Sequence, residues 1–386
     1  MSAAGAVPDG PRRVALDARC FVGVRTGVGN YIAALLAPLS EQHPEVSFHL
    51  YSNEALSFPA RANVVTRVSA PKRRGPWWHN THVVEMLRED GIEVFWGTNG
   101  LIPLRGLGRT ATVLTLHDLV YHFAPRTQTP MMRWQSRVFQ PMCARAADRV
   151  VAVSEATAHD VAAVYGRRPD HVVHPLIAPQ FGRSEAAAAD DALASLNLPA
   201  DFILTVGTLE PRKNIATLIE AICNRVDAGV KLPPLVVVGG RGWADDRIVA
   251  LIERAGASGA VRFLGFVPNG VLPHLYTRCR AFVMPSVYEG FGMPLLEAQL
   301  CGAPVVHGTH PSMREAAGPC GVVVEPSFDG LCRMLDDLAN ASLPLACRLP
   351  STIDNNAERR AAGMWEAIAG AWRSKTQQSS NRARHR

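Results

Sequence analysis

One stretch of the chain decides the fold class: PSVYEGFGMPLLEAQLCG, residues 285–302. The apolar run 281–284 before it has the length of a buried strand, and a glycine-containing loop leads from it into a helical pattern. Pro294 suits the first turn of that helix, and Gly302 predicts its end. Because an apolar run at 304–306 follows, the stretch predicts a strand–loop–helix–strand unit of a parallel sheet.

The same alternation of apolar runs and helical patterns extends through the chain. In the first half we expect strands at 14–17, 47–51, 94–96, 111–116 and 149–153. In the second half we expect strands at 202–206, 235–238, 261–264, 281–284, 304–306 and 321–324. The predicted fold is therefore α/β, with two Rossmann-like domains whose parallel sheets face a central cleft, where the carboxyl ends of strands bind ligands.

A change in composition around Pro179 places the domain boundaries within the 386 residues. We expect a Rossmann-like N-terminal domain at 1–178, a linker with one short helix at 179–200, and a Rossmann-like C-terminal domain at 201–356. The last two segments are predicted to be a helix that crosses back to the first domain, at 357–372, and a disordered basic tail, at 373–386.

Charge excludes one class of function. The formal net charge is +6, and residues 373–386 hold five Lys and Arg but no acidic side chain. Because the rest of the chain is close to neutral, it lacks the basic face that nucleic-acid binding needs. A basic, Ser/Gln-rich tail is typical of a solvated end, and the alternative is contact with an anionic membrane surface.

The cysteines and the first residues favour a cytoplasmic protein. The eight cysteines contain no Cys-x-x-Cys pair, so we expect buried reduced thiols rather than disulfides or zinc ligands. Residues 1–10 lack the basic and apolar parts of a secretory signal, and no apolar run approaches the ~20 residues of a membrane span.

Two glutamates of the stretch 285–302 are candidate sugar ligands. Glu289 lies in the loop and Glu297 in the first helical turn, where carboxylates can accept hydrogen bonds from sugar hydroxyls. The junction of loop and helix also leaves backbone N–H groups free to bind phosphate. A single glutamate would more simply be solvated or complement the helix dipole, but the pair in this setting favours ligand binding.

Two adjacent cations, Arg212 and Lys213, follow the strand at 202–206 within GTLEPRKN, residues 207–214. At the carboxyl end of a strand, such a pair can neutralise a diphosphate leaving group without a metal. The sequence contains no Asp-x-Asp, so we expect neither a metal nor another cofactor.

Two segments of the first half are predicted to face the cleft. His117 ends the strand at 111–116, and Gly27, Val28 and Gly29 open a helix after the first strand. The glycine spacing is not Gly-x-Gly-x-x-Gly, which argues against a nicotinamide dehydrogenase. The structural alternatives are a satisfied histidine and a tight turn without a ligand.

These segments together resemble the retaining glycosyltransferases of family 4, which have the GT-B fold. Glu289 and Glu297 match both ends of the Glu-x7-Glu motif of that family, and GTLEPRKN is similar to its Gly-x-Leu-x-x-x-Lys-Asn segment. The resemblance implies that the domain at 1–178 binds the acceptor and the domain at 201–356 binds the nucleotide sugar. The implied catalytic residues are His117, Glu289, Arg212 and Lys213.

The resemblance also implies a set of donor-binding residues. They are Gly27, Val28, Gly29, Gly207, Thr208, Arg212, Lys213, Gly239, Phe266, Ser286, Glu289, Gly290, Phe291, Gly292, Met293 and Glu297.

Residues 16–19 and 26–30 look like the branch that makes mannose- or rhamnose-rich bacterial surface polysaccharides. This likeness implies transfer of mannose from GDP-mannose to a saccharide or lipid-linked acceptor in the synthesis of O-antigen or exopolysaccharide. The alternatives are a rhamnosyl donor, a UDP-sugar, a nucleotide-sugar epimerase, and a non-catalytic scaffold with the same fold.

A further segment combines cations with aromatic residues. Residues 72–74 are basic and precede Trp77 and Trp78, and Arg126 and the stretch 131–134 extend the pattern. Such a mixture suits a phospholipid interface, which would make the protein peripheral on the inner face of the plasma membrane. The alternative is that the tryptophans begin a helix that packs on the core.

Overall fold

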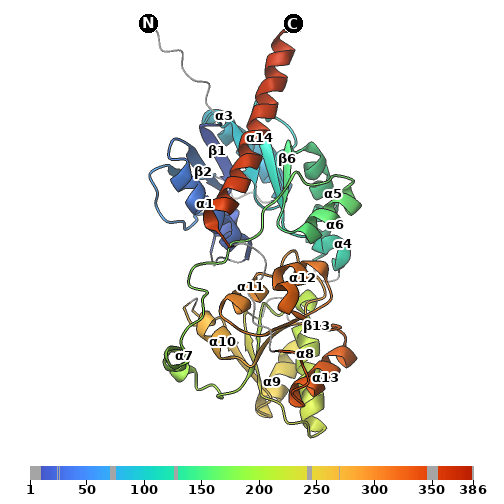
Figure 1. The fold of residues 1–386 in the computed structure, drawn as a ribbon. Coiled ribbons are helices and arrows are strands. Elements are labelled where there is room, and N and C mark those ends of the chain that lie inside the picture. The colour runs from blue at the N-terminus through green and yellow to red at the C-terminus, as the bar shows by residue number, and fades with distance from the viewer. Residues whose placement is uncertain are drawn as a thin grey trace. The chain divides into compact units, whose positions relative to one another are not determined.

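The computed structural model divides into two α/β units, each drawn in Figure 1. Unit 1 comprises residues 1–119, 130–176 and 355–386, and unit 2 comprises residues 120–129 and 177–354. The structure describes residues 10–23, 25, 27–69, 75–125, 129–240, 246–268, 270–345 and 355–384.

Unit 1 is built on a seven-stranded sheet in the order β3-β2-β1-β4-β5-β6-β7, and its recorded pairings are all parallel. Its strands are β1 (Arg13–Asp17), β2 (Ser47–Ser52), β3 (Val64–Val68), β4 (Val94–Gly97), β5 (Ala111–Leu116), β6 (Arg149–Ala152) and β7 (His171–Val172). Every residue of β4 and β5 is buried, which explains why these strands are apolar along their whole length rather than alternating.

Helices cover the sheet of unit 1. They are α1 (Gly27–Gln42), α2 (Gly75–Trp78), α3 (Val84–Glu89), α5 (Pro130–Ala146), α6 (Glu155–Tyr165) and α14 (Ala357–Arg384), with a π-helical turn at His79–Val83. Helix α14 packs against α1 and against strands β4 to β7. The chain thus returns to unit 1 through α14, which includes the segment 357–372.

The predicted disordered tail is wrong for most of its length, since α14 continues to Arg384. Three contacts hold residues 372–375 of this helix against unit 1. Trp372 Nε1 donates to Glu93 at 3.2 Å, Arg149 donates to Ser374 Oγ at 2.9 Å, and Lys375 pairs with Asp148 at 3.5 Å. Sequence composition carries no sign of these tertiary partners.

Unit 2 is built on a six-stranded sheet in the order β10-β9-β8-β11-β12-β13, again with parallel pairings. Its strands are β8 (Ile203–Val206), β9 (Leu235–Val238), β10 (Val261–Gly265), β11 (Ala281–Met284), β12 (Val305–His307) and β13 (Val322–Val323). Its helices are α4 (Val120–Phe123), α7 (Ala186–Leu193), α8 (Ile215–Asp227), α9 (Asp246–Ala257), α10 (Leu272–Arg278), α11 (Met293–Leu300), α12 (Pro311–Ala317) and α13 (Phe328–Ala339).

The eleven predicted strands are all present, to within two residues at each end, but the prediction missed β3 and β7. Strand β3 is mostly exposed and β7 has only two residues, so neither leaves a clear apolar pattern. The predicted linker at 179–200 carries its one short α-helix, α7, and belongs to unit 2. Residues 120–129 also join unit 2, where the ring of Phe123 stacks on Tyr288 at 5.2 Å.

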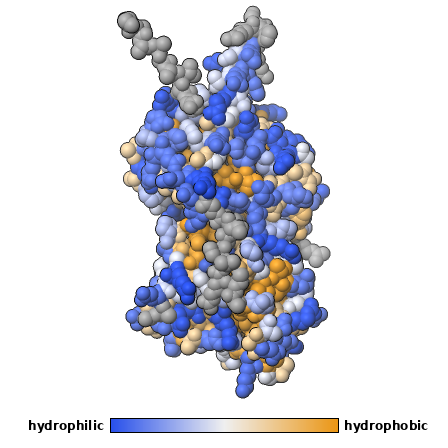
Figure 2. Space-filling view, in the orientation of Figure 1, coloured by the Kyte–Doolittle hydropathy of each residue, from blue (hydrophilic) through white to orange (hydrophobic). Residues whose placement is uncertain are grey.

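The surface visible in Figure 2 is mainly hydrophilic on both units, with smaller hydrophobic areas. Within the described part of the chain, no helix combines the length and the apolar character that a membrane span requires. Among the described residues, six cysteines form no disulfide, whereas Cys320 is disulfide-bonded, so the prediction of reduced thiols is wrong at that position. Cys347 lies outside the described residues.

Candidate active site at the strand ends of unit 2

Three strands of unit 2 end close together at their carboxyl edge, where backbone hydrogen bonds join the loops. Gly207 N–H donates to Val238 at 2.9 Å, and Gly239 N–H donates to Gly265 at 2.8 Å. Gly239 has φ +141°, and a Cβ at this position would lie 2.1 Å from the carbonyl oxygen of Gly207. Only glycine fits this approach, which brings the loops after β8 and β9 into contact.

The loop after β8 presents the two predicted cations on a single 3₁₀ turn, Pro211–Lys213. Asn214 ends the turn in the left-handed conformation, and its side-chain amide donates to Pro326 at 2.7 Å. Helix α8 begins at the next residue. The turn therefore holds Arg212 and Lys213 between a strand end and a helix start, as the sequence predicts.

Glu289 comes to the same place from the loop after β11. Its carboxylate pairs with Arg212 Nη1 at 2.8 Å and with Lys213 Nζ at 2.6 Å, and Glu210 pairs with Arg212 Nε at 3.1 Å. The backbone supports this meeting, because Val287 N–H donates to the Arg212 carbonyl at 2.9 Å. The structure therefore brings Arg212, Lys213 and Glu289 together in one cluster.

The charges of this cluster determine its protonation states. Burial alone would raise the pKa of Glu289, but the charges on Arg212 and Lys213 outweigh burial and lower that pKa to about 2. Burial lowers the pKa of Lys213, and the charge on Glu289 opposes that shift. The cluster therefore holds an ionised carboxylate between two side chains that can bind an anion.

Glu297 lies one turn into α11 rather than in its first turn, because the helix begins at Met293. The hydroxyl of Tyr276 donates to its carboxylate at 3.1 Å. Burial raises the pKa of Glu297 to about 7, and the Tyr276 hydrogen bond and the Lys213 charge oppose this shift. The second glutamate is thus half-buried, close to its titration point at neutral pH, and electrostatically coupled to Lys213.

The glycine loop between the two glutamates is fixed by a hydrogen bond from α12 and by close backbone packing. Ser312 Oγ donates to the Glu289 carbonyl at 2.7 Å, and Gly292 has φ +106° immediately before α11. Ser286 and Phe291 are buried, whereas Gly290 and Met293 are partly accessible. Gly308 approaches the Ser286 carbonyl so closely that a Cβ there would lie 2.3 Å from it.

Two further predicted residues lie on the same edge. Phe266 follows β10 and is largely exposed, and a Cβ on Gly240 would lie 2.6 Å from its ring. Thr208 is partly accessible in the loop after β8. Arg241 and Gly242, which the sequence places beside Gly239 and Gly240, lie outside the described residues.

The strand ends of unit 1

His117 stands at the carboxyl end of β5 in unit 1, as the sequence predicts. Its Nε2 lies 2.8 Å from the carbonyl oxygen of Thr98, and the Tyr31 ring packs edge-on at 5.2 Å. Because a carbonyl can only accept, Nε2 carries the proton and Nδ1 keeps a lone pair. Burial lowers the pKa of His117, while the Thr98 carbonyl and Asp118 oppose the shift, so the neutral ring is favoured.

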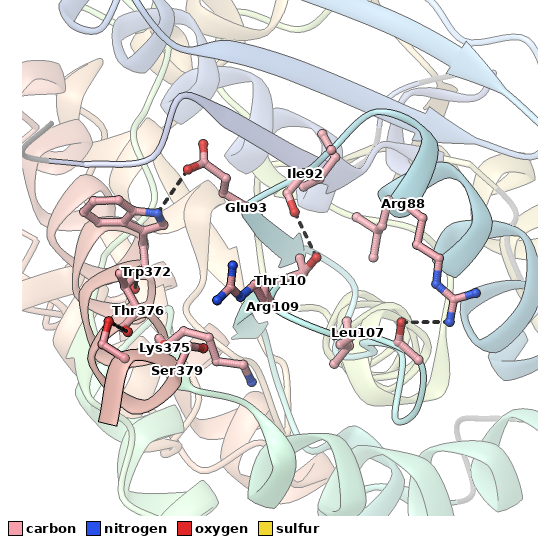
Figure 3. A pocket seen from close by; sticks show the side chains of 15 residues that line it. Arg88, Ile92, Glu93, Leu107, Arg109, Thr110, Trp372, Lys375, Thr376 and Ser379 are labelled. Carbon is pink, nitrogen blue, oxygen red and sulfur yellow. Dashed lines mark hydrogen bonds between the residues drawn. The ribbon is translucent and has the colours of Figure 1, made fainter. Parts of the chain in front are cut away.

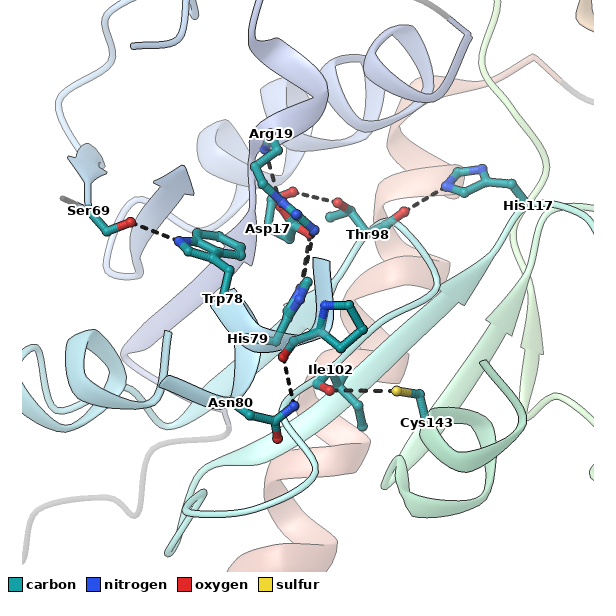
Figure 4. A network of polar contacts seen from close by, with 11 residues as sticks. Asp17, Arg19, Ser69, Trp78, His79, Asn80, Thr98, Ile102, His117 and Cys143 are labelled. Carbon is teal, nitrogen blue, oxygen red and sulfur yellow. Dashed lines mark hydrogen bonds and ion pairs between the residues drawn. The ribbon is translucent and has the colours of Figure 1, made fainter. Parts of the chain in front are cut away.

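The sequence did not single out a buried ionic network on this edge (Figure 4). Arg19 donates to Asp17 through Nε at 2.9 Å and Nη2 at 2.7 Å, and His79 Nε2 lies 3.1 Å from the same carboxylate. The Arg19 guanidinium also stacks over Trp78 at 4.5 Å. Asp17-x-Arg19 was the available signal, but the partner His79 is 62 residues away in the chain.

Burial alone would raise the pKa of Asp17, but the charge and hydrogen bonds of Arg19, with His79, hold it well below its usual range. The network is connected to His117, because Thr98 donates its hydroxyl to the Asp17 carbonyl, and the Thr98 carbonyl accepts from His117. The network therefore fixes the backbone that positions His117.

The predicted glycine turn of unit 1 has a packing reason. Helix α1 begins at Gly27, and a Cβ on Gly29 would lie 2.6 Å from the Cys20 carbonyl. Val28 is partly accessible beside them, and Thr26 lies outside the described residues. The turn brings α1 close to the end of β1, which is also where the Asp17 network begins.

A pocket of about 670 Å³ lies elsewhere in unit 1, beside the starts of β4 and β5 and along α14 (Figure 3). Its charged side chains are Arg88, Glu93, Arg109 and Lys375. None of the predicted site residues lines it. Because parallel sheets bind their ligands at the carboxyl ends, this pocket at the amino ends is not the predicted site.

The structure divides the predicted phospholipid interface. Trp78 is buried and its Nε1 donates to Ser69 at 2.8 Å, so its part in that surface was wrongly predicted. Trp77 and the residues 131, 132 and 134 are exposed. Residues 72–74 and Arg126 lie outside the described residues.

Comparison with known proteins

Two family models match the chain and together take up most of both units. "Glycosyltransferase Family 4" matches residues 25–181, and "Glycosyl transferases group 1" matches residues 192–349. The chain therefore belongs to the family-4 glycosyltransferases.

Solved structures share the fold over nearly the whole chain. HepE of Anabaena, in complex with UDP and glucose, is 18% identical with a TM-score of 0.64, covering 96% of this chain and 99% of HepE. WaaG, a glycosyltransferase involved in lipopolysaccharide biosynthesis, is 18% identical with a TM-score of 0.66, covering 94% and 99%. This likeness in fold, together with the two α/β units and their parallel sheets, confirms the predicted fold class.

One curated relative has a more specific name. The "O-antigen chain mannosyltransferase B" of Escherichia coli is 33% identical over 245 residues, which are 62% of this chain and 63% of that enzyme. The chain thus spans less than two thirds of the length of this relative. The predicted resemblance to O-antigen mannosyltransferases is confirmed at this level of similarity.

Proposed function

We propose that this protein is a retaining glycosyltransferase that moves a hexose from a nucleotide diphosphate donor to a saccharide or lipid-linked acceptor. The observation that carries the proposal is the meeting of Arg212, Lys213 and Glu289 at the carboxyl edge of unit 2. Cations that converge at a strand end suit a diphosphate, and a carboxylate beside them suits the hydroxyls of the attached sugar.

The ion pairs give the cluster a defined task in donor binding. Diphosphate oxygens would compete with Glu289 for Arg212 and Lys213, and each Glu289 oxygen that is released could accept from a sugar hydroxyl. Glu297 would accept from the ribose. Since its pKa is about 7, it can ionise at neutral pH when hydroxyl donors stabilise the charge.

The proposed transfer needs neither a metal nor another cofactor. The bond between the sugar carbon and the diphosphate oxygen breaks as the acceptor oxygen bonds to that carbon from the same face. Arg212 and Lys213 stabilise the charge that develops on the leaving diphosphate, and the acceptor proton passes to a phosphate oxygen. His117, whose Nδ1 keeps a lone pair, is proposed to accept a hydrogen bond from the donor sugar.

GDP-mannose is the donor that we propose first, and bacterial O-antigen or a related polysaccharide is the proposed product. The 33% identity to an O-antigen mannosyltransferase supports this choice. A UDP-sugar is the second candidate, because HepE, a structural neighbour, is in complex with UDP and glucose. We also propose a cytoplasmic location, which the six free cysteines support and the disulfide at Cys320 counts against.

Donor turnover tests the proposal directly. The protein is incubated with one donor at a time: GDP-mannose, another GDP-sugar, a dTDP-sugar or a UDP-sugar. Each reaction is run with and without a bacterial lipid extract and with and without EDTA, and release of the nucleoside diphosphate is measured. We expect GDP release from GDP-mannose that requires the extract, persists in EDTA and leaves an α-linked product. Donor conversion without any acceptor would indicate an epimerase, no turnover with any donor would indicate a scaffold, and loss of turnover in EDTA would contradict metal independence.

A further inference from the structure

Helix α5 turns an apolar stripe outward. Met131, Trp134, Val138 and Met142 recur at spacings of three and four residues, which places them on one face of the helix. Their exposed fractions are 64%, 57%, 37% and 48%, whereas Cys143 on the inner side is buried against Ile102. A surface helix of a folded unit normally buries its apolar stripe, so this reversed pattern is typical of a surface that binds a partner.

A second element extends the stripe. Trp77 on α2 is 73% exposed, and a groove of about 780 Å³ is lined by Trp77 together with Phe139 and Met142. We call these apolar side chains, with the stripe of α5, the α5–Trp77 face. Because two elements that are distant in the sequence contribute to one apolar groove, the face is larger than a single exposed residue would make it.

The charges around this face select one kind of partner. Helix α5 carries Arg133, Arg137 and Arg145 and contains no Asp or Glu. Arg105 and Arg145 also line the groove. Apolar side chains with tryptophan and arginine, and without acids, fit the boundary between acyl chains and anionic headgroups. The core of a protein–protein interface is also apolar, so the apolar side chains alone do not distinguish the two kinds of partner. The arginines without acidic neighbours favour the anionic lipid surface.

We propose that the α5–Trp77 face seats unit 1 on a bilayer that contains anionic phospholipid. Trp77, Trp134 and the methionines enter the headgroup and acyl boundary, and the arginines of α5 bind lipid phosphates. This assignment keeps Trp77 and part of the stretch 131–134 from the interface that the sequence predicts, and the structure adds Val138 and Met142. It does not depend on the basic end of α14. It also does not depend on the proposed donor or reaction, since it concerns binding to lipid alone.

Sedimentation with lipid vesicles tests this surface without an activity measurement. The protein is mixed with vesicles of phosphatidylcholine alone or of phosphatidylcholine with phosphatidylglycerol, and the pelleted fraction is measured. We expect binding to the anionic vesicles only, and we expect it to weaken as salt rises from about 0.1 M to about 1 M and the screening length falls from ~10 to ~3 Å. Trp134→Ser and Trp77→Ser should each weaken binding about tenfold, and Arg137→Gln about fivefold.

Matched controls come from helix α13 of unit 2, where Phe328 is 38% exposed and Arg333 is also exposed. Phe328→Ser and Arg333→Gln should leave vesicle binding unchanged, and thermal melts establish that every variant is folded. Equal binding of Trp134→Ser and wild type would overturn the proposal, as would wild-type binding that ignores lipid charge. Self-association that Trp134→Ser abolishes, without vesicle binding, would instead assign the face to a second copy of the chain.

Discussion

Each of the two sheets ends in an ionic cluster at its carboxyl edge, and the two clusters are built differently. In unit 1, Arg19 gives two donors to a single carboxylate, Asp17, which is completely buried. In unit 2, the carboxylate of Glu289 is shared between Arg212 and Lys213, and all three side chains come from loops and retain some exposure. A pair that is closed around a buried carboxylate supports the fold, whereas a shared, accessible one can exchange a partner for a ligand.

The largest expected effect is on turnover when the shared cluster loses a cation. Lys213→Ala removes a charge that stabilises the leaving diphosphate, and we expect kcat to fall about 10²- to 10³-fold, or about 2.7–4 kcal/mol. Stability should change little, because Glu289 keeps its pair with Arg212. Steady-state kinetics with the donor that the panel identifies measures the effect, with Arg333→Ala as the exposed control. Unchanged kcat would remove Lys213 from the mechanism.

In the closed cluster of Asp17 and Arg19, a substitution should change stability rather than turnover. Asp17→Asn leaves Arg19 without its buried partner, so we expect a loss of about 3–5 kcal/mol of unfolding free energy. Glu41→Gln, which breaks the exposed pair between Arg61 and Glu41, should cost less than about 1 kcal/mol. Denaturant unfolding of both variants measures the difference. Equal losses would mean that the Asp17 network does not support the fold.

The pH dependence of stability follows from the same pair. Because the folded-state pKa of Asp17 is depressed, its stabilising contribution is present above the unfolded pKa of about 4 and is lost as pH falls through the folded value. Asp17→Asn should therefore lose less stability than wild type in acid. Chemical melts between about pH 5 and pH 2 test this, and parallel curves for the two proteins would contradict it.

Donor binding should depend on pH through Glu297. With a pKa of about 7, this side chain is mostly neutral below that pH, and only the ionised form is a strong acceptor for ribose hydroxyls. Calorimetric affinity for GDP-mannose, whose diphosphate does not titrate in this range, should be about tenfold weaker at pH 6 than at pH 8. Glu297→Gln should flatten the profile; a variant with the wild-type slope would assign the titration to another group.

The smallest effect should come from Tyr276. Its hydrogen bond lowers the pKa of Glu297, so Tyr276→Phe should move the midpoint of that binding profile upward by at most about one pH unit. The direction decides the test. A downward shift would show that the hydroxyl does not stabilise the ionised carboxylate.

The same comparison explains how much the sequence could predict. The shared cluster was found because Arg212, Lys213 and Glu289 follow apolar strands, and parallel topology places such loops on one edge. The closed cluster was missed because its members are a strand end and a residue on a later helical turn, with no regular spacing between Asp17 and His79.

Other errors have the same origin in tertiary contacts. Trp77 and Trp78 are adjacent in sequence, yet one is exposed and the other buried, and composition alone cannot distinguish them. The end of α14 is polar, and its order depends on partners such as Asp148 that only the fold supplies. Unbroken apolar runs predict strands well. Whether a polar segment is ordered depends on its tertiary contacts, which the sequence does not show.

Helix α14 also determines the order in which the two units can be completed during synthesis. Its residues Ala361, Met364, Ile368 and Ala371 are completely buried in unit 1, although they are made after all of unit 2. During synthesis, the surface of unit 1 that α14 covers therefore remains exposed until unit 2 has been translated. A nascent chain stopped near residue 354 would carry a complete second unit and an unfinished first one.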